Sequence, residues 1–426
     1  MTSGVAQLRV ILHNVQVGTL TRSRSGLVTF LPDPDWLDSN QRPRLGVAFL
    51  RDPSPRRAGT GLPPWFENLL PEPGSVLRQR ICARLGLRES DSFALLKVLG
   101  MDLPGAVTVT NGTSSQAELP LATDDLTPGE LEYDASWRFS LAGVQLKFSM
   151  ALRGQKFAVP ASDELGRWIV KIPPTNLPQL PRIEHWTMRW AAESGLTVAE
   201  TRIVPMADVQ TPGPTDLEPD AEVLAVRRFD RTDDGARIHQ EDLAQALDLL
   251  PGAKYVDQGH VRVGHDAIVR LLSDVASEAV AVDYVRRLAF VIASGNTDEH
   301  LKNWSLLWPG DALRPTLTPA YDQVAIISLP GFRWHPDRAT QAHPYPRLAL
   351  PFGGSRDLVS LDEARLHTFA HRSSLGRAAT ILHEGLEAAR NAWPAIAPHA
   401  PADMVEAIEE HWRRVPLLRD HGPLKS

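Results

Sequence analysis

The feature that most constrains this chain is a loop dense in polar residues that directly follows an apolar segment. Residues 285–293, VRRLAFVIA, have the composition of a buried helix, and residues 294–305, SGNTDEHLKNWS, follow at once. Holding so many amide, acidic and basic groups near a core is costly unless they satisfy one another or bind a metal or ligand. The sequence therefore indicates either a polar, solvated loop or a catalytic loop, and the rest of the chain has to distinguish the two.

Composition narrows the classes of protein that need to be considered. The chain has 426 residues, 43% hydrophobic and 23% charged, which is typical of a globular protein with two or three lobes. Its net charge of -6 gives no general attraction to nucleic acid, so any DNA contact should be local or made through a partner. Cys82 is the only cysteine, which suits a reducing compartment. We see no signal peptide and no run long enough to cross a membrane, and therefore expect a soluble cytoplasmic protein.

Hydrophobic periodicity divides the chain into four regions. Residues 1–110 alternate like strands and then take helical spacing from about residue 63, and residues 111–136 are polar and turn-rich, as in a linker. Residues 137–232 return to strands around one helix, and residues 233–426 are mostly helical, with Ser360 and Glu363 spaced as a capping box. The sequence predicts an α+β protein with a β-rich N-terminal subdomain and a mainly helical C-terminal lobe.

Two acidic positions and one amide in the helical C-terminal lobe, residues 233–426, have the spacing of a phosphoryl-transfer site. Asp298 is followed five residues later by Asn303, as in a kinase catalytic loop, where the Asp orients the attacking hydroxyl and the Asn binds Mg²⁺. Asp322 follows in PAYDQV and would be a second oxygen ligand for Mg²⁺. The pair alone is a weak signal, and Asp322 taken alone could instead cap the next turn.

An upstream lysine and glutamate extend the pattern. Lys171 lies in the strand-like WIVKI, and Glu184 lies in the helix-like segment that follows. A strand lysine paired with a helix glutamate positions the ATP phosphates in kinases. By itself, Lys171 is more simply explained as an outward-facing residue on an alternating strand. The ordered set of Lys171, Glu184, Asp298, Asn303 and Asp322 is much harder to attribute to chance.

The remaining part of such a site is a loop that holds phosphate. The chain has no G-x-G-x-x-G motif in this region and no Walker motif. Residues 139–150, FSLAGVQLKFSM, instead indicate a strand–turn–strand, with Ala142 and Gly143 at the turn. Small residues at a turn let backbone N–H groups approach phosphate oxygens. Ser140 is a hydroxyl in the same loop.

These motifs resemble the HipA family of serine/threonine kinases, the toxins of bacterial toxin–antitoxin pairs. The resemblance covers nearly the whole chain. It is carried by PWFENLLPE at 64–72, SLAGVQLKFSM at 140–150, AVRRFDR at 225–231, GNTDEHLKNWS at 295–305 and PAYDQV at 319–324. The family implies a two-lobed, protein-kinase-like fold. One departure is Arg227, where the family often has Glu, and it leaves the detail of the adenine site open.

The resemblance also implies roles for individual residues. Asp298 resembles the catalytic aspartate, Asn303 and Asp322 would hold Mg²⁺, and Lys171, paired with Glu184, would contact the ATP phosphates. Ser140 resembles a serine whose autophosphorylation expels the nucleotide loop, with Ser136 and Ser149 as weaker candidates. The whole implied ATP site comprises Ala142, Gly143, Val144, Gln145, Leu146, Lys147, Lys171, Arg227, Arg228, Phe229, His300, Leu301, Lys302, Asn303, Tyr321 and Asp322.

The family further implies ATP and Mg²⁺ as cofactors, an aminoacyl-tRNA synthetase as the protein substrate, and growth arrest or persistence as the outcome. It implies a HipB-like helix-turn-helix antitoxin, with DNA contacted mainly through that partner and no membrane contact. Two alternatives remain open at this point. The chain could phosphorylate a small molecule, since kinases of related architecture share the Asp-x-x-x-x-Asn loop, or it could be an inactive co-repressor of its own operon.

Overall fold

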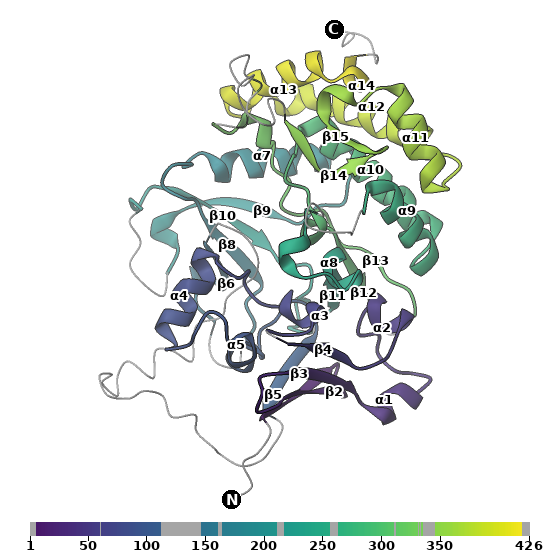
Figure 1. Cartoon of the computed structure of the whole chain (residues 1–426). Helices are drawn as coiled ribbons and strands as arrows, with labels where there is room; N and C mark the ends of the chain where they lie inside the picture. Colours follow the sequence, from purple (N-terminus) through teal and green to yellow (C-terminus); the bar gives the residue numbers. More distant parts are fainter. Residues whose placement is uncertain are drawn as a thin grey trace, which may run out of the picture. The chain divides into compact units, whose positions relative to one another are not determined.

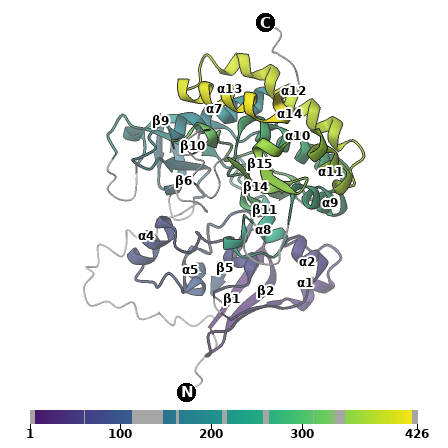
Figure 2. The same ribbon diagram turned by 45° about the horizontal axis from the view of Figure 1, so that its top comes forward.

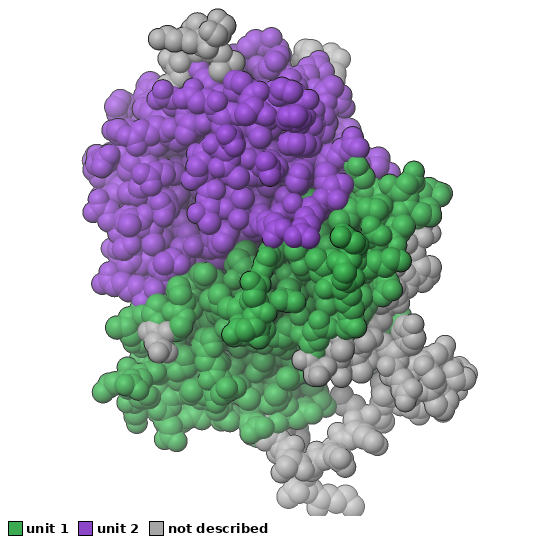
Figure 3. All heavy atoms as spheres, turned by 180° about the vertical axis from the view of Figure 1, so that it is seen from behind, with its two compact units in different colours: residues 1–174, 204–252, 307–313 green, residues 175–203, 253–306, 314–426 purple. Residues whose placement is uncertain are grey.

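The structure is a computed structural model that describes residues 6–59, 61–111, 146–160, 164–210, 217–255, 263–310, 312–330, 332, 334 and 346–419. The chain divides into two compact units, coloured separately in Figure 3. Unit 1 comprises residues 1–174, 204–252 and 307–313, and unit 2 comprises residues 175–203, 253–306 and 314–426. Both units are therefore assembled from segments that are distant in the sequence.

The first sheet of unit 1 is built from the alternating N-terminal stretch. Its strand order is β4-β3-β2-β1-β5, and each neighbouring pair is antiparallel. Leu8, Val10 and Leu12 of β1 are buried while the residues between them are more exposed, which is the pattern expected of a sheet with one face on the core. The strands are β1 Ala6–Leu12, β2 Val15–Arg22, β3 Val28–Pro32, β4 Arg56–Ala58 and β5 Val107–Asn111.

Short helices pack around this sheet and carry the PWFENLLPE segment. The rings of Phe30, Phe49, Trp65 and Phe66 form an edge-on aromatic cluster. Glu67 is buried against the guanidinium of Arg78 at 3.0 Å, so this charged residue of the segment has a structural role. The helices are α1 Pro34–Asp38, α2 Val47–Arg51, α3 Pro64–Glu67, α4 Val76–Arg84 and α5 Ser92–Leu99.

A second sheet of unit 1 carries the predicted phosphate-binding lysines. Its strand order is β7-β6-β8-β10-β9, and β8 lies between β6 and β10 with antiparallel pairing on both sides. The strands of this sheet are β6 Leu146–Arg153, β7 Lys156–Ala158, β8 Trp168–Ile172, β9 Thr201–Pro205 and β10 Glu222–Arg227. Strand β11, His239–Asp242, does not belong to this sheet and is followed by α8, Leu243–Ala246. β9 begins in unit 2 and ends in unit 1.

Unit 2 is mainly helical, and its centre is α10, Glu278–Ser294. In Figures 1 and 2, α12 runs beside α10, and the two backbones approach closely because Gly385 of α12 faces Ala289 of α10. Trp190, Trp393 and Trp412 pack together at the same core. The other elements are α7 Leu180–Glu193, α9 His265–Val275, β12 Ser305–Trp308 (which ends in unit 1), β13 Thr316–Leu317, β14 Arg347–Phe352, β15 Ser355–Asp357, α11 Glu363–Ser373, α12 Ala378–Ile396, α13 Ala402–Arg414 and α14 Pro416–Arg419.

One local prediction is wrong. Ser360 was expected to cap a helix with Glu363, but the N-cap of α11 is Asp362, whose side chain accepts from the Arg365 N–H. The Ser360 hydroxyl is instead bonded to the carbonyl oxygen of Asp357 at 2.8 Å. Asp is at least as good an N-cap as Ser, so the start of the helix moves by two residues. No helix among the described residues is long and apolar enough to span a membrane.

Candidate active site

A glycine ends helix α10 and fixes the start of the polar loop. Gly295 is the C-cap of α10, with a left-handed φ of 63°. A Cβ at this position would lie 2.6 Å from the side chain of Ile327. Only glycine meets both the backbone and the packing requirement, so residues 296–303, the 296–303 loop, leave the helix from a fixed point.

Hydrogen bonds fold the 296–303 loop so that Asp298 and Asn303 lie side by side. The carbonyl oxygen of Asp298 accepts from the N–H of His300 at 2.7 Å and from Nδ2 of Asn303 at 3.0 Å. The N–H of Asn303 in turn donates to the carbonyl oxygen of His300 at 2.9 Å. Because Nδ2 is used within the loop, the Oδ1 atom of Asn303 is the one that can coordinate a ligand.

A buried glutamate joins the 296–303 loop to the segment that carries Asp322. Oε2 of Glu299 accepts from Nδ2 of Asn296 at 2.9 Å, and Oε1 accepts from Nε2 of Gln323 at 3.0 Å. Burial raises the pKa of Glu299 well above its usual value, because the bond from Gln323 and the charge of Arg287 offset only part of the cost of burial. Glu299 thus connects two of the predicted site segments through neutral amide donors.

Asp322 itself is held in an unusual backbone conformation. Its φ is 54°, in the left-handed region that non-glycine residues rarely adopt. Ala320, two residues earlier, is held on both sides, since its N–H donates to the carbonyl oxygen of Thr197 at 2.8 Å and its carbonyl oxygen accepts from the N–H of Ala199 at 2.9 Å. Strain of this kind persists where neighbouring contacts fix the backbone and is frequent at functional sites.

Tyr321 ties the same segment to the other end of the loop. Its hydroxyl donates to the carbonyl oxygen of Lys302 at 2.9 Å and lies 2.6 Å from the hydroxyl of Ser305. Leu301 and Lys302 are both buried, with Leu301 in the core. The predicted residues Asp298, His300, Leu301, Lys302, Asn303, Tyr321 and Asp322 therefore belong to one hydrogen-bonded pair of segments in unit 2.

His300 is buried within this arrangement as a neutral ring. Burial, together with the charges of Lys254 and Lys302, lowers the pKa of His300 to about 3. Its Nδ1 atom is buried and has no hydrogen-bond partner among the described residues. A buried polar atom of this kind is what a residue that contacts a phosphate oxygen would show, because such atoms are otherwise nearly always paired.

Tyr255 is a site residue that the sequence did not reveal. Its hydroxyl donates to Oδ1 of Asp298 at 2.6 Å, although it precedes Asp298 by 43 residues. Its ring also meets the ring of His300 edge-on, with centroids 5.1 Å apart. It stands in AKYV, which has no spacing or composition that marks a functional residue, and no signal in the sequence alone would have identified it.

In unit 1, the predicted phosphate-binding lysines are neighbours on one sheet. Lys147 of β6 is directly opposite Lys171 of β8, so both side chains project from the same face. Lys171 is only 3% exposed, which contradicts the outward-facing alternative for this residue. This register places two positive charges side by side on one face of the sheet, which suits the binding of a triphosphate. Leu146, the neighbour of Lys147 along β6, pairs with Ile172.

The predicted adenine contact at Arg227, Arg228 and Phe229 lies at the end of β10. The main-chain N–H of Arg228 donates to the carbonyl oxygen of Arg167 at 2.9 Å, so it is already used within the protein. The guanidinium of Arg227 pairs with the exposed Asp233. Contact with adenine through the main chain of this segment remains a prediction.

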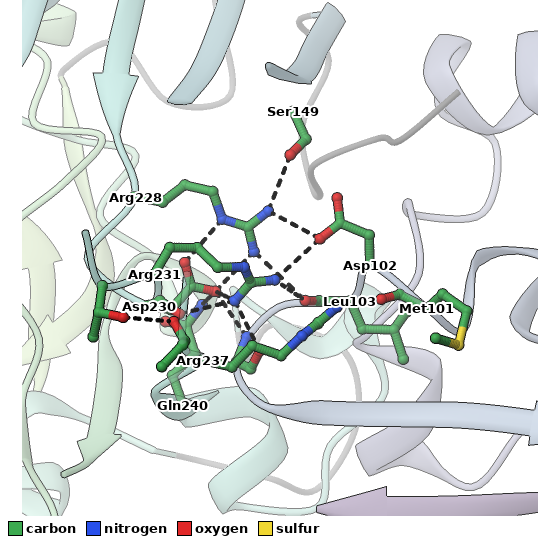
Figure 4. A network of polar contacts seen from close by, with 12 residues as sticks. Met101, Asp102, Leu103, Ser149, Arg228, Asp230, Arg231, Arg237 and Gln240 are labelled. Carbon is green, nitrogen blue, oxygen red and sulfur yellow. Dashed lines mark hydrogen bonds and ion pairs between the residues drawn. The ribbon is translucent and has the colours of Figure 1, made fainter. Parts of the chain in front are cut away.

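Arg228, Asp230 and Arg231 of the AVRRFDR segment form a buried network in unit 1, shown in Figure 4. Arg228 forms a two-pronged bond to Asp230, at 2.9 and 2.8 Å, and Arg231 joins Asp230 to Asp102 at 3.0 and 3.1 Å. Burial alone would raise the pKa of Asp230, but the charges of Arg228 and Arg231 hold it well below its usual value. The motif therefore ties β10 to residues 102–105.

Ser149 belongs to this network. It is 2% exposed, and its hydroxyl accepts from Nη1 of Arg228 at 3.2 Å. This burial does not favour modification of Ser149, which remains a prediction.

The remaining predictions concern residues in other places. Glu184 is buried on α7 in unit 2, and its pairing with Lys171 remains a prediction. Ser136, Ser140, Ala142, Gly143, Val144 and Gln145 lie outside the described residues.

The oxygen donors in unit 2 suit a hard cation. Asp322 offers a carboxylate, and Asn303 offers an amide oxygen whose orientation is fixed by the bond from its Nδ2 to Asp298. Mg²⁺ prefers oxygen ligands and is usually held by one or two carboxylates together with substrate phosphates. The residues present therefore fit Mg²⁺ brought in with a nucleotide.

Two family models match the chain, the HipA N-terminal domain over residues 8–110 and the HipA-like C-terminal domain over residues 139–393. The chain is 34% identical to the putative kinase Y4dM of Sinorhizobium fredii, over 98% of each protein. It is 28% identical to the serine/threonine-protein kinase toxin HipA of Shewanella oneidensis, over 61% of this chain and 62% of that protein.

A solved structure extends the likeness to the fold. The HipA chain of the Shewanella oneidensis complex of HipA, HipB and operator DNA superposes with a TM-score of 0.67 at 22% identity, covering 98% of this chain and 100% of that chain. At this identity the likeness establishes the fold alone. It confirms the kinase-like α+β fold predicted from the sequence.

Proposed function

The chain belongs to the HipA family of kinase toxins, and from this premise we propose that it transfers the γ-phosphoryl group of ATP to a Ser or Thr hydroxyl of another protein. The observation that carries the proposal is the hydrogen-bonded pairing of Asp298 with Asn303 in the 296–303 loop. This is the arrangement that a kinase needs to orient a hydroxyl beside a metal-bound triphosphate.

Each residue has a distinct role in the proposed reaction. Asp298 orients the attacking hydroxyl and accepts its proton as the new O–P bond forms and the bond to ADP breaks. Asn303 and Asp322 hold Mg²⁺, which neutralises negative charge on the phosphates when bound. Lys147 and Lys171 supply fixed positive charge from unit 1, and the neutral ring of His300 donates to a phosphate oxygen.

The finer parts of the proposal follow from the family. The protein substrate would be an aminoacyl-tRNA synthetase, and its phosphorylation would cause growth arrest or persistence. A HipB-like helix-turn-helix protein would neutralise the kinase and carry most of the contact with operator DNA, as suggested by the complex named above. The regions 1–110, 111–136, 137–232 and 233–426 would be its N-terminal subdomain, linker, nucleotide-binding part and catalytic lobe.

Autophosphorylation on Ser140 is a further part of the proposal. A phosphoserine there would add nearly two negative charges to a loop that binds phosphate, which would repel the nucleotide. Peptide mapping after incubation with ATP and Mg²⁺ tests this directly. We expect phosphate on Ser140, and phosphate found only on other peptides would remove it from this role.

The substrate class can be tested with γ-labelled ATP, Mg²⁺ and a cell lysate. We expect label on a lysate protein with the wild type and none with Asp298→Ala. Asp283→Ala is a matched control, because Asp283 is an exposed aspartate of α10 paired with Arg286 outside the site. Label found only in small metabolites would identify a small-molecule kinase. No turnover by the folded wild type would favour an inactive co-repressor.

A further inference from the structure

Tyr255 stands out because its hydroxyl is bonded to the residue on which the proposed chemistry depends. The phenol donates to Oδ1 of Asp298 at 2.6 Å, the distance of a charge-assisted bond from a hydroxyl to a carboxylate. Tyr255 is half-buried, and Asp298 is half-buried in unit 2 as well. The contact joins two segments that the family motifs in the sequence do not connect.

The main chain of Asp298 is already fixed by its own loop. Its N–H donates to Oδ1 of Asn296 at 3.3 Å, and its carbonyl oxygen accepts from His300 and Asn303. These bonds hold the main chain at Asp298. The bond from Tyr255 acts on the side chain instead, where it holds Oδ1 of the carboxylate.

Tyr255 is itself anchored to the 296–303 loop. The N–H of Leu301 donates to the carbonyl oxygen of Lys254 at 3.2 Å, which places the main chain before Tyr255 against the loop. The ring meets His300 at an interplanar angle of 76°, and the ammonium of Lys254 lies 5.2 Å from its centroid. With ring and backbone both held, the hydroxyl is presented to Asp298 at a fixed position.

We infer that Tyr255 is a positioning residue that sets the orientation of the Asp298 carboxylate toward the substrate hydroxyl. This inference rests on the proposed function. A competing explanation is that the phenol occupies the place of a substrate hydroxyl and blocks the site. The two explanations predict opposite changes in rate when the hydroxyl is removed.

The test compares Tyr255→Phe with Tyr284→Phe. Both changes remove one phenol hydroxyl from unit 2, and the hydroxyl of Tyr284 is bonded to Nδ1 of His265 at 2.7 Å, away from Asp298. For Tyr255→Phe we expect kcat to fall about 10- to 100-fold with the KM for ATP unchanged, because misorientation of one catalytic group affects the chemical step. For Tyr284→Phe, equalised for folded fraction, we expect the wild-type kcat.

A double variant shows whether Tyr255 acts through Asp298. In an Asp298→Asn background, Tyr255→Phe should lower the residual rate no further. A wild-type or increased kcat for Tyr255→Phe, or a full additive loss in the double variant, would overturn the inference.

Failure of the proposed function is distinguishable from failure of this inference. If the wild type transfers no phosphate, both fail. The thermal unfolding midpoints of Tyr255→Phe, Asp298→Asn and the double variant would then be compared. Non-additive shifts in these midpoints would show that Tyr255 and Asp298 form a structural contact without a catalytic role.

Discussion

Two buried carboxylates, one in each unit, show how differently this chain treats negative charge. Asp230 in unit 1 receives bonds from two guanidiniums and from the N–H of Gly105, and its pKa lies well below its usual value. Glu299 in unit 2 receives bonds from two neutral amides, and its pKa lies well above its usual value. Both are at most 2% exposed.

The difference separates a structural network from a site. The charges around Asp230 compensate one another inside the protein, which is what a permanent connection between strand β10 and residues 102–105 requires. The region around Glu299 contains Asp322 in its left-handed backbone conformation and the Nδ1 atom of His300, which has no hydrogen-bond partner in the described part of the chain. Groups left in this state are typical of a surface that binds a charged ligand.

The largest expected effect is on the stability of the protein, when Asp230 of unit 1 is changed. Asp230→Asn removes one of the two carboxylates that pair with the buried guanidiniums of Arg228 and Arg231, and we expect the free energy of unfolding to fall by about 3–5 kcal/mol. Chemical denaturation measures it. Asp233→Asn is the matched control, because Asp233 pairs with Arg227 at the surface and should matter little. Equal effects of the two changes would mean that the network is not the structural element described.

An intermediate effect is expected at the metal-binding position. Asp322→Asn removes one charged ligand while keeping a residue that tolerates the left-handed backbone, so folding should be preserved. We expect kcat to fall about 100-fold at fixed Mg²⁺, equivalent to about 2.7 kcal/mol in the barrier, with partial recovery at higher Mg²⁺. Phosphoryl transfer followed across a Mg²⁺ titration measures this. A loss of stability without a loss of rate would place Asp322 with the structural residues instead.

The smallest expected effect is on how stability depends on pH, because Glu299 and Asp230 should contribute with opposite sign. Because the pKa of Glu299 is raised on folding, its contribution to stability is present below about pH 4.5 and is lost as the pH rises toward the folded pKa. Asp230 behaves oppositely, since its contribution is present above about pH 3.8 and is lost on acidification. Subtracting the unfolding free energy of Glu299→Gln from that of the wild type should give a difference that falls by up to about 1.4 kcal/mol per pH unit. A flat or rising difference would contradict the raised pKa.

The sequence predicted those parts of the site whose residues are close together in the chain. Asp298 and Asn303 could be identified because five residues bring them to one loop, and the strand at Lys171 because its alternation is local. The burial of Lys171 depends on its neighbours β6 and β10 and was not predictable from one strand.

Contacts between distant segments were not predictable. Tyr255 precedes Asp298 by 43 residues, and Arg231 follows Asp102 by 129, so only the folded chain brings each pair together. The capping error at Ser360 has a different cause, because Asp362 is an equally good cap two residues later and local preference does not choose between them.

The most direct test of the central claim is the rate of phosphoryl transfer from ATP to protein by the wild type and by Asp298→Asn, compared at equal unfolding midpoints. The account predicts a rate at least about 1,000-fold lower for the variant, since it loses both the orienting group and the proton acceptor. Equal rates in two equally folded proteins would contradict the assignment of the 296–303 loop as the catalytic site.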